Sequence, residues 1–432
     1  MRTTYSGKWF ALSIICLGIG GSFALLVGLS RAPFISDFLP KDYFQHALVG
    51  HVTFAILFWL MLSAVVLWSY HFKGRDLNWS IWSAIVGTVF VALSALSASG
   101  EAYLNNYVPT IFDPMFFIGL AAMFIAFVIN VFHYTPEAVK GVSSDDMVTN
   151  GLSTAVLIAL ILAASVAVSL VRLGGDLDVF MPQVFFERLF WIPGHIQQFL
   201  NGAMLVSVWY LLAEITTGDK LRSYGFLKFA NKVLIFSTGF LLAVSFFFDP
   251  LERSMRVGSE IIYAFGLGVP LFLHIINISR QFRFDRKRPA SVSLVISMTL
   301  YLYGIFIAYG GFNNDTRVPA HYHGAVTALT LALMGFAYHM ISGYKIRVAL
   351  PRLALAQPYA YGIGMLLFIT GLFVSGIFGA PRKTFGVGWT ENSAVIASLG
   401  LMGIGTLLAV IGGAIFVVYS GLTLIKEEKL DG

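Results

Sequence analysis

Residues 317–341 read RVPAHYHGAVTALTLALMGFAYHMI, with His321 and His323 one residue apart at the start of a long apolar run. On an α-helix, two positions correspond to a rotation of about 200°, so the two imidazoles point to nearly opposite sides. A single zinc site would favour two histidines on one face, four positions apart. Opposed imidazoles instead suit two metal centres on the two flanks of one helix, such as two hemes that each need an axial ligand.

The whole chain has the composition of a polytopic membrane protein. Of its 432 residues, 57% are hydrophobic and 12% are charged. A hydrocarbon core of about 30 Å needs roughly 20 apolar residues per helix. Twelve such runs are predicted, near 9–30, 44–70, 78–98, 115–134, 150–171, 186–215, 225–248, 256–279, 291–311, 320–342, 356–379 and 396–424. We therefore expect an all-α fold, with residues 1–432 forming a single transmembrane domain of twelve helices.

The distribution of basic residues predicts the orientation of these helices. If the N-terminus is cytoplasmic, most of the 28 lysines and arginines fall on inner segments, as the positive-inside rule requires. Both termini are then cytoplasmic, and we expect the chain to lie in the cell inner membrane as a multi-pass protein. Basic loops at the inner leaflet account for the net charge of +6, so no nucleic-acid partner is expected.

Depth in the membrane separates the nine histidines into two groups. In the predicted topology His51 of the second span, His195 of the sixth, and His321 and His323 of the tenth all fall in the outer third of the membrane. An ionisable residue inside a span is a functional hypothesis by default. Four others lie at or near the inner ends of spans, where histidines commonly bond neighbouring helices: His71, His133, His274 and His339. His46 lies at the outer end of the second span, 140° around the helix from His51, and is the weaker ligand candidate of the two.

These features resemble the catalytic subunit I of the heme–copper oxidase superfamily, which contains the cytochrome oxidases and the bacterial nitric oxide reductases. The resemblance covers the whole chain. Its motifs are GHVTFAILFW around His51, WIPGHIQQF around His195, the His-x-His of the tenth helix, and GAPRKTF after the eleventh. The stretch YLNNYVPTIFDP before the fourth helix is also similar to the family, although no residue in it is given a role.

The resemblance implies a role for each of the four deep histidines. His51 and His323 would be the two axial ligands of a low-spin heme. His321 would be the single axial ligand of a high-spin heme whose other face is open to a gas. His195 would be one ligand of a second metal, which is copper in oxidases and non-heme iron in nitric oxide reductases.

Arg382 and Lys383 complete the cofactor site that the resemblance implies. They stand where the family has a Pro-Arg-Arg segment, whose cations hold heme propionates, and they lie on the predicted outer side. The implied cofactors are two hemes, for which we expect the b type. The implied partners are membrane lipid, cytochrome c or another periplasmic electron donor, and other subunits of a respiratory complex.

The sequence departs from the family at the second metal. The family adds an adjacent histidine pair in the seventh helix, where this chain has Val244 and Ser245, and the sequence contains no His-His pair. Four residues after His195, where a tyrosine or glutamate is usual, stands Phe199, with Gln198 beside it. One imidazole with an amide and a hydroxyl is a poor site for copper or non-heme iron, which puts the second metal in doubt.

Three functions remain open. The first is an oxidoreductase of the cytochrome oxidase or nitric oxide reductase type, in which the low-spin heme passes electrons to a high-spin heme that reduces O₂ or NO. The second is a diheme electron-transfer subunit of a larger respiratory complex, without the second metal or gas reduction. The third is a transporter or structural protein whose histidines only bond helices. The opposed histidines and the Pro-Arg-Lys loop argue against the third, because helix packing requires neither.

Overall fold

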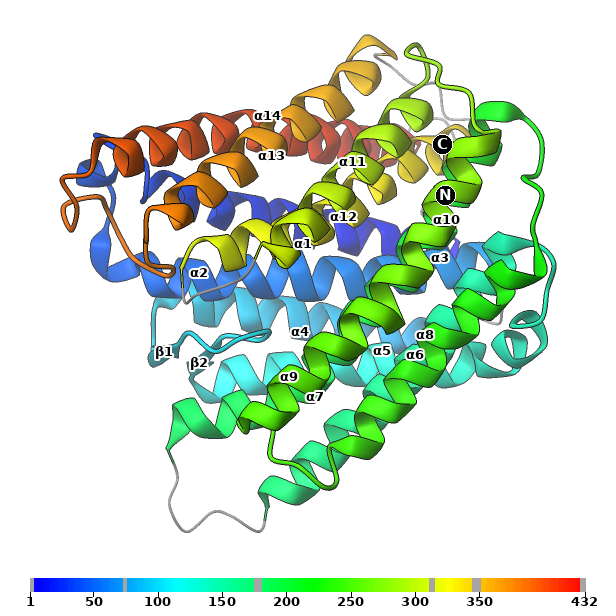
Figure 1. Ribbon diagram of the computed structural model, residues 1–432, viewed down its shortest axis with the longest axis horizontal. Helices are drawn as coiled ribbons and strands as arrows, with labels where there is room; N and C mark the ends of the chain where they lie inside the picture. The colour runs from blue at the N-terminus through cyan, green and yellow to red at the C-terminus, as the bar shows by residue number, and fades with distance from the viewer. Residues whose placement is uncertain (1–3, 73–75, 175–180, 311–314, 344–350, 428–432) are drawn as a thin grey trace. The chain divides into compact units, whose positions relative to one another are not determined.

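The computed structural model describes residues 4–72, 76–174, 181–310, 315–343 and 351–427 (Figure 1). Within these ranges twelve helical segments are long and apolar enough to cross a membrane. They coincide with the twelve runs predicted from the sequence, so the all-α architecture with twelve spans is confirmed. The only strands in the described ranges form one short hairpin between the third and fourth spans.

Ten spans are single α-helices, and two contain a π-helical turn. The single helices are α1 (Tyr5–Leu29), α4 (Asn78–Ser97), α5 (Pro114–Gly141), α6 (Met147–Leu173), α7 (Pro182–Thr217), α8 (Gly225–Val244), α11 (Pro289–Tyr309), α12 (Arg317–Gly343), α13 (Pro351–Ile377) and α14 (Ser393–Glu427). The second span is made of α2 (Phe44–Val52), the π-helical η3 (Thr53–Phe58) and α3 (Trp59–Phe72). The eighth is made of α9 (Arg253–Ile262), the π-helical η5 (Tyr263–Gly268) and α10 (Val269–Gln281).

Short elements lie between the spans. Two 3₁₀ turns, η1 (Ser36–Phe38) and η2 (Lys41–Tyr43), connect α1 to α2. The strands β1 (Glu101–Tyr103) and β2 (Thr110–Phe112) pair in antiparallel register, with Glu101 opposite Phe112. The six residues that join these strands include Tyr107, whose φ of 64° is left-handed.

The helices begin where the sequence provides the usual start signals. Asp113 caps α5 by accepting a hydrogen bond from the backbone N–H of Met115, and Pro114 is the first residue of that helix. Prolines also begin α7, α11 and α13. A proline is well suited to the first helical position, because its missing N–H would have no partner there.

The chain forms two compact units, and each is described by itself. The first consists of Met1–Leu60 and Phe284–Gly432, and the second of Met61–Arg283. The first unit therefore contains α1, α2, η3 and α11 to α14, and the second contains most of α3 and the elements from α4 to α10. The single transmembrane domain over residues 1–432 stays a prediction.

In the first unit, small residues let neighbouring helices approach closely. The helices α13 and α14, orange and red in Figure 1, lie side by side. A Cβ atom on Gly412 would come within 2.7 Å of Tyr361 Cα, and one on Gly405 within 2.8 Å of Phe368 Cα. Apolar side chains gain little hydrophobic energy by moving from lipid to a helix interface, so close van der Waals contact of this kind stabilises the pair.

In the second unit, a buried chain of hydrogen bonds joins four helices. His274 on α10 bonds Asn231 on α8 through Nε2 at 3.1 Å and Tyr210 on α7 through Nδ1 at 3.2 Å. Asn231 in turn donates to Asn150 on α6 at 2.7 Å, and Asn277 donates to Tyr210 at 2.9 Å. These contacts match the helix-bonding role expected of a histidine at a span end.

Substituting a glycine at the α13–α14 contact tests this packing. We expect Gly412→Val to destabilise the protein by about 1–3 kcal/mol, because the new side chain meets the backbone of Tyr361. Gly413→Val is the matched control, since no atom lies within 4 Å of its added Cβ and its effect on helix propensity is the same. Thermal unfolding in detergent gives the melting temperature of each variant. Equal melting temperatures for Gly412→Val and Gly413→Val would contradict the close contact.

Asp146, which caps α6, provides a test of pH dependence. Its carboxylate accepts bonds from the Thr149 N–H at 3.1 Å and the Thr149 hydroxyl at 2.5 Å, and pairs with Lys220 at 3.0 Å. Burial alone would raise the pKa of Asp146, but the hydrogen bonds from Thr149 and Lys220 outweigh it and hold the pKa below its ordinary value. A lowered pKa stabilises the folded state above the unfolded pKa, and this stability is lost as pH falls through the folded value.

We therefore expect Asp146→Asn to lower the free energy of unfolding at pH 7. The loss should be at most about 1 kcal/mol, because the ion pair is partly exposed to solvent. The difference from the wild type should shrink as the pH falls below about 4. Asp145→Asn is the control, because its carboxylate is 86% exposed. Unfolding curves from pH 3 to pH 7 test the expectation, and a gap that does not change with pH would refute it.

Candidate functional site

The imidazoles of His51 and His323 lie beside each other within the first unit. Their ring centroids are 6.4 Å apart and their planes differ by 9°. Two metal–imidazole bonds of about 2 Å, plus about 1.1 Å from each ring centre to its nitrogen, give roughly 6 Å between ring centres. The spacing and near-parallel planes therefore fit two axial ligands of one heme iron.

Backbone carbonyls orient both imidazoles. His51 Nδ1 lies 3.1 Å from the carbonyl oxygen of Gly20 on α1, and His323 Nδ1 lies 2.7 Å from that of Pro319. Because a carbonyl only accepts, each Nδ1 carries the proton and each Nε2 keeps its lone pair for a metal. A Cβ atom on Gly20 would lie 2.7 Å from the backbone nitrogen of Ala55, so only glycine allows α1 to come this close.

The π-helical turn η3 begins two residues after His51. A π turn inserts one extra residue into a helix and is frequent at functional sites. Here it changes the rotational register between His51 on α2 and the residues of α3. The sequence alone predicted one regular helix for this span, since the segment TFAILF contains no proline or glycine to mark the irregularity.

His321 contacts a different helix from His323. Its Nδ1 lies 2.8 Å from the carbonyl oxygen of Gly304 on α11, whereas the ring of His323 packs edge-on against Phe368 of α13 at 4.9 Å. Gly304 and Gly324 bring α11 and α12 together, because a Cβ atom on Gly324 would lie 2.8 Å from the Gly304 nitrogen. The Gly304 carbonyl fixes the His321 tautomer whose Nε2 keeps its lone pair for a metal.

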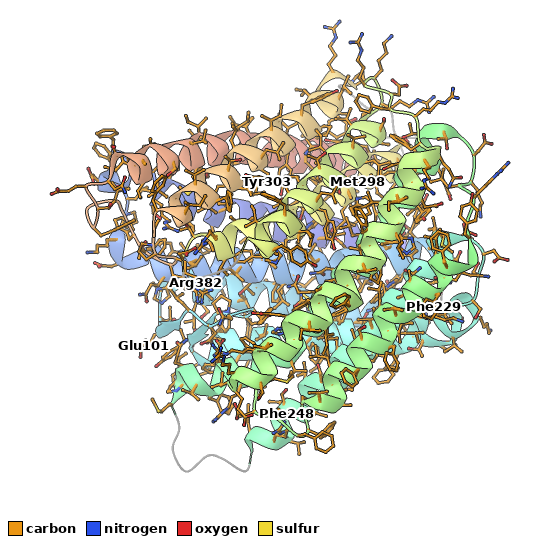
Figure 2. All side chains as sticks on the ribbon, in the orientation of Figure 1. Glu101, Phe229, Phe248, Met298, Tyr303 and Arg382 are labelled. Carbon is orange, nitrogen blue, oxygen red and sulfur yellow. The ribbon has the colours of Figure 1, made fainter. Side chains whose placement is uncertain are left out.

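The loop between α13 and α14, in which Figure 2 labels Arg382, is joined to the start of α12. Asp315 and Pro381 form an isolated antiparallel bridge, and the Thr316 N–H donates to the Ala380 carbonyl at 3.0 Å. Asp315 also pairs with Arg317 at 2.7 Å. The segment that carries Arg382 and Lys383 is thus held against the helix that carries His321 and His323, as a propionate-binding loop would need to be.

Arg31, which follows the first apolar run, was given no role by the sequence. The structure brings it to the same loop, although the two segments are 350 residues apart: its Nη2 donates to the Pro381 carbonyl at 2.7 Å and to Thr384 Oγ1 at 3.3 Å. The one signal in the sequence is an arginine placed directly after the first apolar run.

His195, in the second unit, has hydrogen-bond partners on both ring nitrogens. Nδ1 lies 2.7 Å from the Trp191 carbonyl, and Nε2 lies 3.0 Å from the hydroxyl of Tyr107. Since the carbonyl only accepts, Nδ1 donates to it and Nε2 accepts from Tyr107. Tyr263 of η5 stacks on the imidazole at 5.0 Å and donates to the His195 carbonyl at 3.2 Å.

The hairpin loop holds Tyr107 in this position. Asn106 bonds Glu187 on α7 through both its backbone N–H and its side-chain amide. The ring of Tyr107 lies on Gly194, where a Cβ atom would collide with it. Burial raises the pKa of the Tyr107 phenol above its usual value, so the hydroxyl stays protonated and remains a donor. Sequence reasoning gave this tyrosine no role, because neither its left-handed backbone nor its distant partner is visible in the motif.

The residues around His195 do not fit a copper or non-heme iron centre. Val244 is the last residue of α8, and the Ser245 hydroxyl donates to the Leu242 carbonyl at 2.6 Å. Phe199 is fully buried and stacks on Tyr263 at 5.5 Å. No group of three or more His, Cys, Asp or Glu side chains in the described residues could hold a metal ion. Copper and iron need several converging nitrogen or carboxylate ligands.

The phenylalanines that follow these positions do not replace the missing ligands. The side chains of Phe246, Phe247 and Phe248 are 56%, 81% and 42% exposed. Figure 2 shows Phe248 in the turn that follows α8. These side chains therefore form part of the exposed apolar surface of the second unit.

Comparison with known proteins gives the family. Residues 5–415 match the family described as "Cytochrome C and Quinol oxidase polypeptide I". The chain therefore belongs to this family, subunit I of the heme–copper oxidases, whose members are multi-pass membrane oxidoreductases that normally bind heme.

Three relatives are similar to the chain over most of its length. An uncharacterized protein of Aquifex aeolicus is 34% identical over 78% of this chain and 85% of its own length. An uncharacterized protein of Rickettsia prowazekii, RP382, is 25% identical over 100% of this chain and 98% of its own. Cytochrome c oxidase subunit 1 of Thermus thermophilus is 21% identical over 87% of this chain and 76% of its own.

A solved structure confirms the fold. A heme–copper terminal oxidase dimer, studied by cryo-electron microscopy, superposes with a TM-score of 0.76 at 18% identity, covering 97% of this chain and 83% of that one. At 18% identity, this similarity supports a shared arrangement of the helices. The predicted heme–copper oxidase subunit I architecture is confirmed.

Removing the hydroxyl of Tyr107 tests its bond to His195. We expect Tyr107→Phe to destabilise the second unit by about 1–3 kcal/mol, because the buried Nε2 of His195 loses its donor. Tyr103→Phe in the same hairpin is the control, since its hydroxyl bonds only the exposed Glu101. Thermal unfolding in detergent compares the two, and equal melting temperatures would mean that the Tyr107 bond contributes nothing.

Proposed function

We propose that this chain is a diheme electron-transfer subunit of a respiratory complex, with a low-spin heme held by His51 and His323. The observation that carries the proposal is the pair of near-parallel imidazoles 6.4 Å apart. When bound, such a heme supplies reversible one-electron chemistry, and its two axial histidines leave no open position for a gas. That coordination suits the transfer of electrons.

The protein's own residues prepare the site. The carbonyls of Gly20 and Pro319 fix the tautomer of each imidazole and make its Nε2 a better ligand. Phe368 and Tyr322 pack on His323 at 4.9 and 4.7 Å and limit its rotation. The cations Arg382 and Lys383 are proposed to pair with heme propionates, which would keep the anionic groups at the edge of the site.

Reduction of O₂ or NO is the second candidate function. It is favoured by His321, whose Nδ1 is held by Gly304 in the tautomer that suits a single axial ligand of a second, high-spin heme. The reaction in the family also uses the second metal, and the contacts of His195 do not suit one. For this reason the geometry supports electron transfer better than gas reduction, and both catalytic assignments, His195 and His321, remain proposals.

The cellular setting is proposed on the same basis. Both hemes are expected to be of the b type, and the sequence contains no Cys-x-x-Cys-His for covalent attachment of a c-type heme. The chain would lie in the cell inner membrane with both termini in the cytoplasm. Cytochrome c or another periplasmic subunit would donate electrons, and further subunits of the complex would accept them.

Substitution of the ligands tests the proposal. We expect the purified protein to show the optical spectrum of a bis-histidine heme and His323→Ala to lose it, because one axial ligand is removed. His321→Ala should keep the low-spin spectrum and lose the second heme. His46→Ala, at the start of the same helix as His51, is the control and should retain both. A His323→Ala variant with an unchanged spectrum and heme content would overturn the assignment.

Carbon monoxide and metal analysis separate the two candidate functions. For electron transfer alone, the reduced protein should show no carbon monoxide shift and contain no stoichiometric copper or non-heme iron. A shifted spectrum that disappears in His321→Ala would instead favour a gas-binding heme on that residue.

A further inference from the structure

Arg31 is a buried cation in the first unit, in the loop that follows α1. Arg31 as a whole is only 7% exposed. Nη2 donates to Pro381 and Thr384, but Nε is buried without a hydrogen-bond partner. Among the residues that the structure describes, no carboxylate forms an ion pair with this guanidinium. Part of its planar array of donors is therefore left unused.

An unpaired buried charge is costly. Moving an ion from water into a medium of low polarity is strongly unfavourable unless a counter-ion and hydrogen bonds compensate it. Burial lowers the pKa of Arg31 to about 10, against a smaller opposing effect of Tyr322. This value still leaves the side chain charged at neutral pH. The protein thus keeps a positive charge in its interior, and an anion beside Arg31 would offset the cost of burying it.

The position of Arg31 indicates which flank of α12 the anion occupies. Both Arg31 and Arg382 interact electrostatically with the phenol of Tyr322. The ring of Tyr322 stacks on His323 at 4.7 Å with an interplanar angle of 28°. Since Arg31 also bonds Pro381 and Thr384, it lies between the Pro-Arg-Lys loop and the histidine helix. Both arginines therefore lie near Tyr322, the residue whose ring stacks on His323.

The chemistry of the two cations identifies the ligand class. A guanidinium presents parallel N–H donors that match the two oxygens of a carboxylate. We propose that Arg31 is a carboxylate-binding residue, and that the carboxylate is a propionate of the heme held by His51 and His323. This inference rests on the proposed function. A free carboxylate anion from solution has the same chemistry, and the experiment below distinguishes the two sources.

A propionate paired with Arg31 has a consequence for the heme. A fixed positive charge near the iron favours the reduced form, which carries one positive charge less. It also keeps the propionate ionised, because an opposite charge nearby favours the charged form. The midpoint potential of the low-spin heme should then be higher than without Arg31 and should vary little with pH.

The test is an optical redox titration of the purified protein between pH 6 and pH 9. We expect Arg31→Gln to retain the low-spin heme but to raise its oxidised-to-reduced ratio at a fixed applied potential by up to tenfold, about 59 mV for one electron. The potential of this variant should also fall as the pH rises, because its propionate now takes up a proton on reduction. Arg31→Lys should restore much of the wild-type potential. Lys41→Gln, which removes an exposed charge from the same unit, should match the wild type.

The outcomes separate the possible failures. An unchanged potential and pH profile in Arg31→Gln, with the heme present, would overturn the role of Arg31 and leave the proposed function standing. A wild-type potential that shifts with added acetate, while Arg31→Gln does not respond, would identify a free carboxylate as the ligand and overturn the propionate assignment. Absence of a low-spin heme in the wild type would overturn both. If Arg31→Gln does not fold, Arg31→Lys decides: a low-spin heme with a potential somewhat below that of the wild type supports the pairing with a carboxylate, and a potential and pH profile identical to those of the wild type contradict it.

Discussion

The candidate site depends on one interaction, the hydrogen bond from a histidine Nδ1 to a backbone carbonyl. All four deep histidines have this bond, at 2.7 to 3.1 Å. In a membrane interior no water is available to satisfy the Nδ1 proton, so a carbonyl must accept it. Once that bond is made, the tautomer is fixed and Nε2 becomes the atom that can bind a metal or accept a proton. Glycines make two of these bonds possible by allowing α1 and α11 to come close enough.

The same bond leads to different chemistry because of what meets Nε2. At His51 and His323 the two rings lie beside each other at the separation that one iron between them would require. At His195 the corresponding atom accepts a bond from Tyr107 at 3.0 Å. In this structure a residue that the family motif assigns to a metal has both ring nitrogens hydrogen-bonded, because a neighbouring loop supplies a donor. The identity of a histidine does not determine its function; its second partner does.

The fold was predictable from the sequence to a much greater extent than the site. Apolar runs directly report the length needed to cross a bilayer, so the twelve spans required no knowledge of long-range contacts. The opposed directions of His321 and His323 follow from helical geometry alone. Arg31 and Tyr107 could not be found in this way, because their partners lie 350 and 88 residues away. Tyr107 also depends on a left-handed backbone and on the missing side chain of Gly194, and the π-helical turns leave no mark in composition.

The bridge between Asp315 and Pro381 joins the loop of cations to the first turn of the histidine helix. Arg31 adds a further bond to the same loop from the end of α1. Ligands and counter-charges that share one rigid support cannot drift apart when the charge between them changes. In the proposed function, the nuclear rearrangement that accompanies gain or loss of an electron would then be small. A small reorganisation energy lowers the activation barrier of electron transfer in either direction, so this ordinary pair of loop contacts would help to set the speed of the reaction.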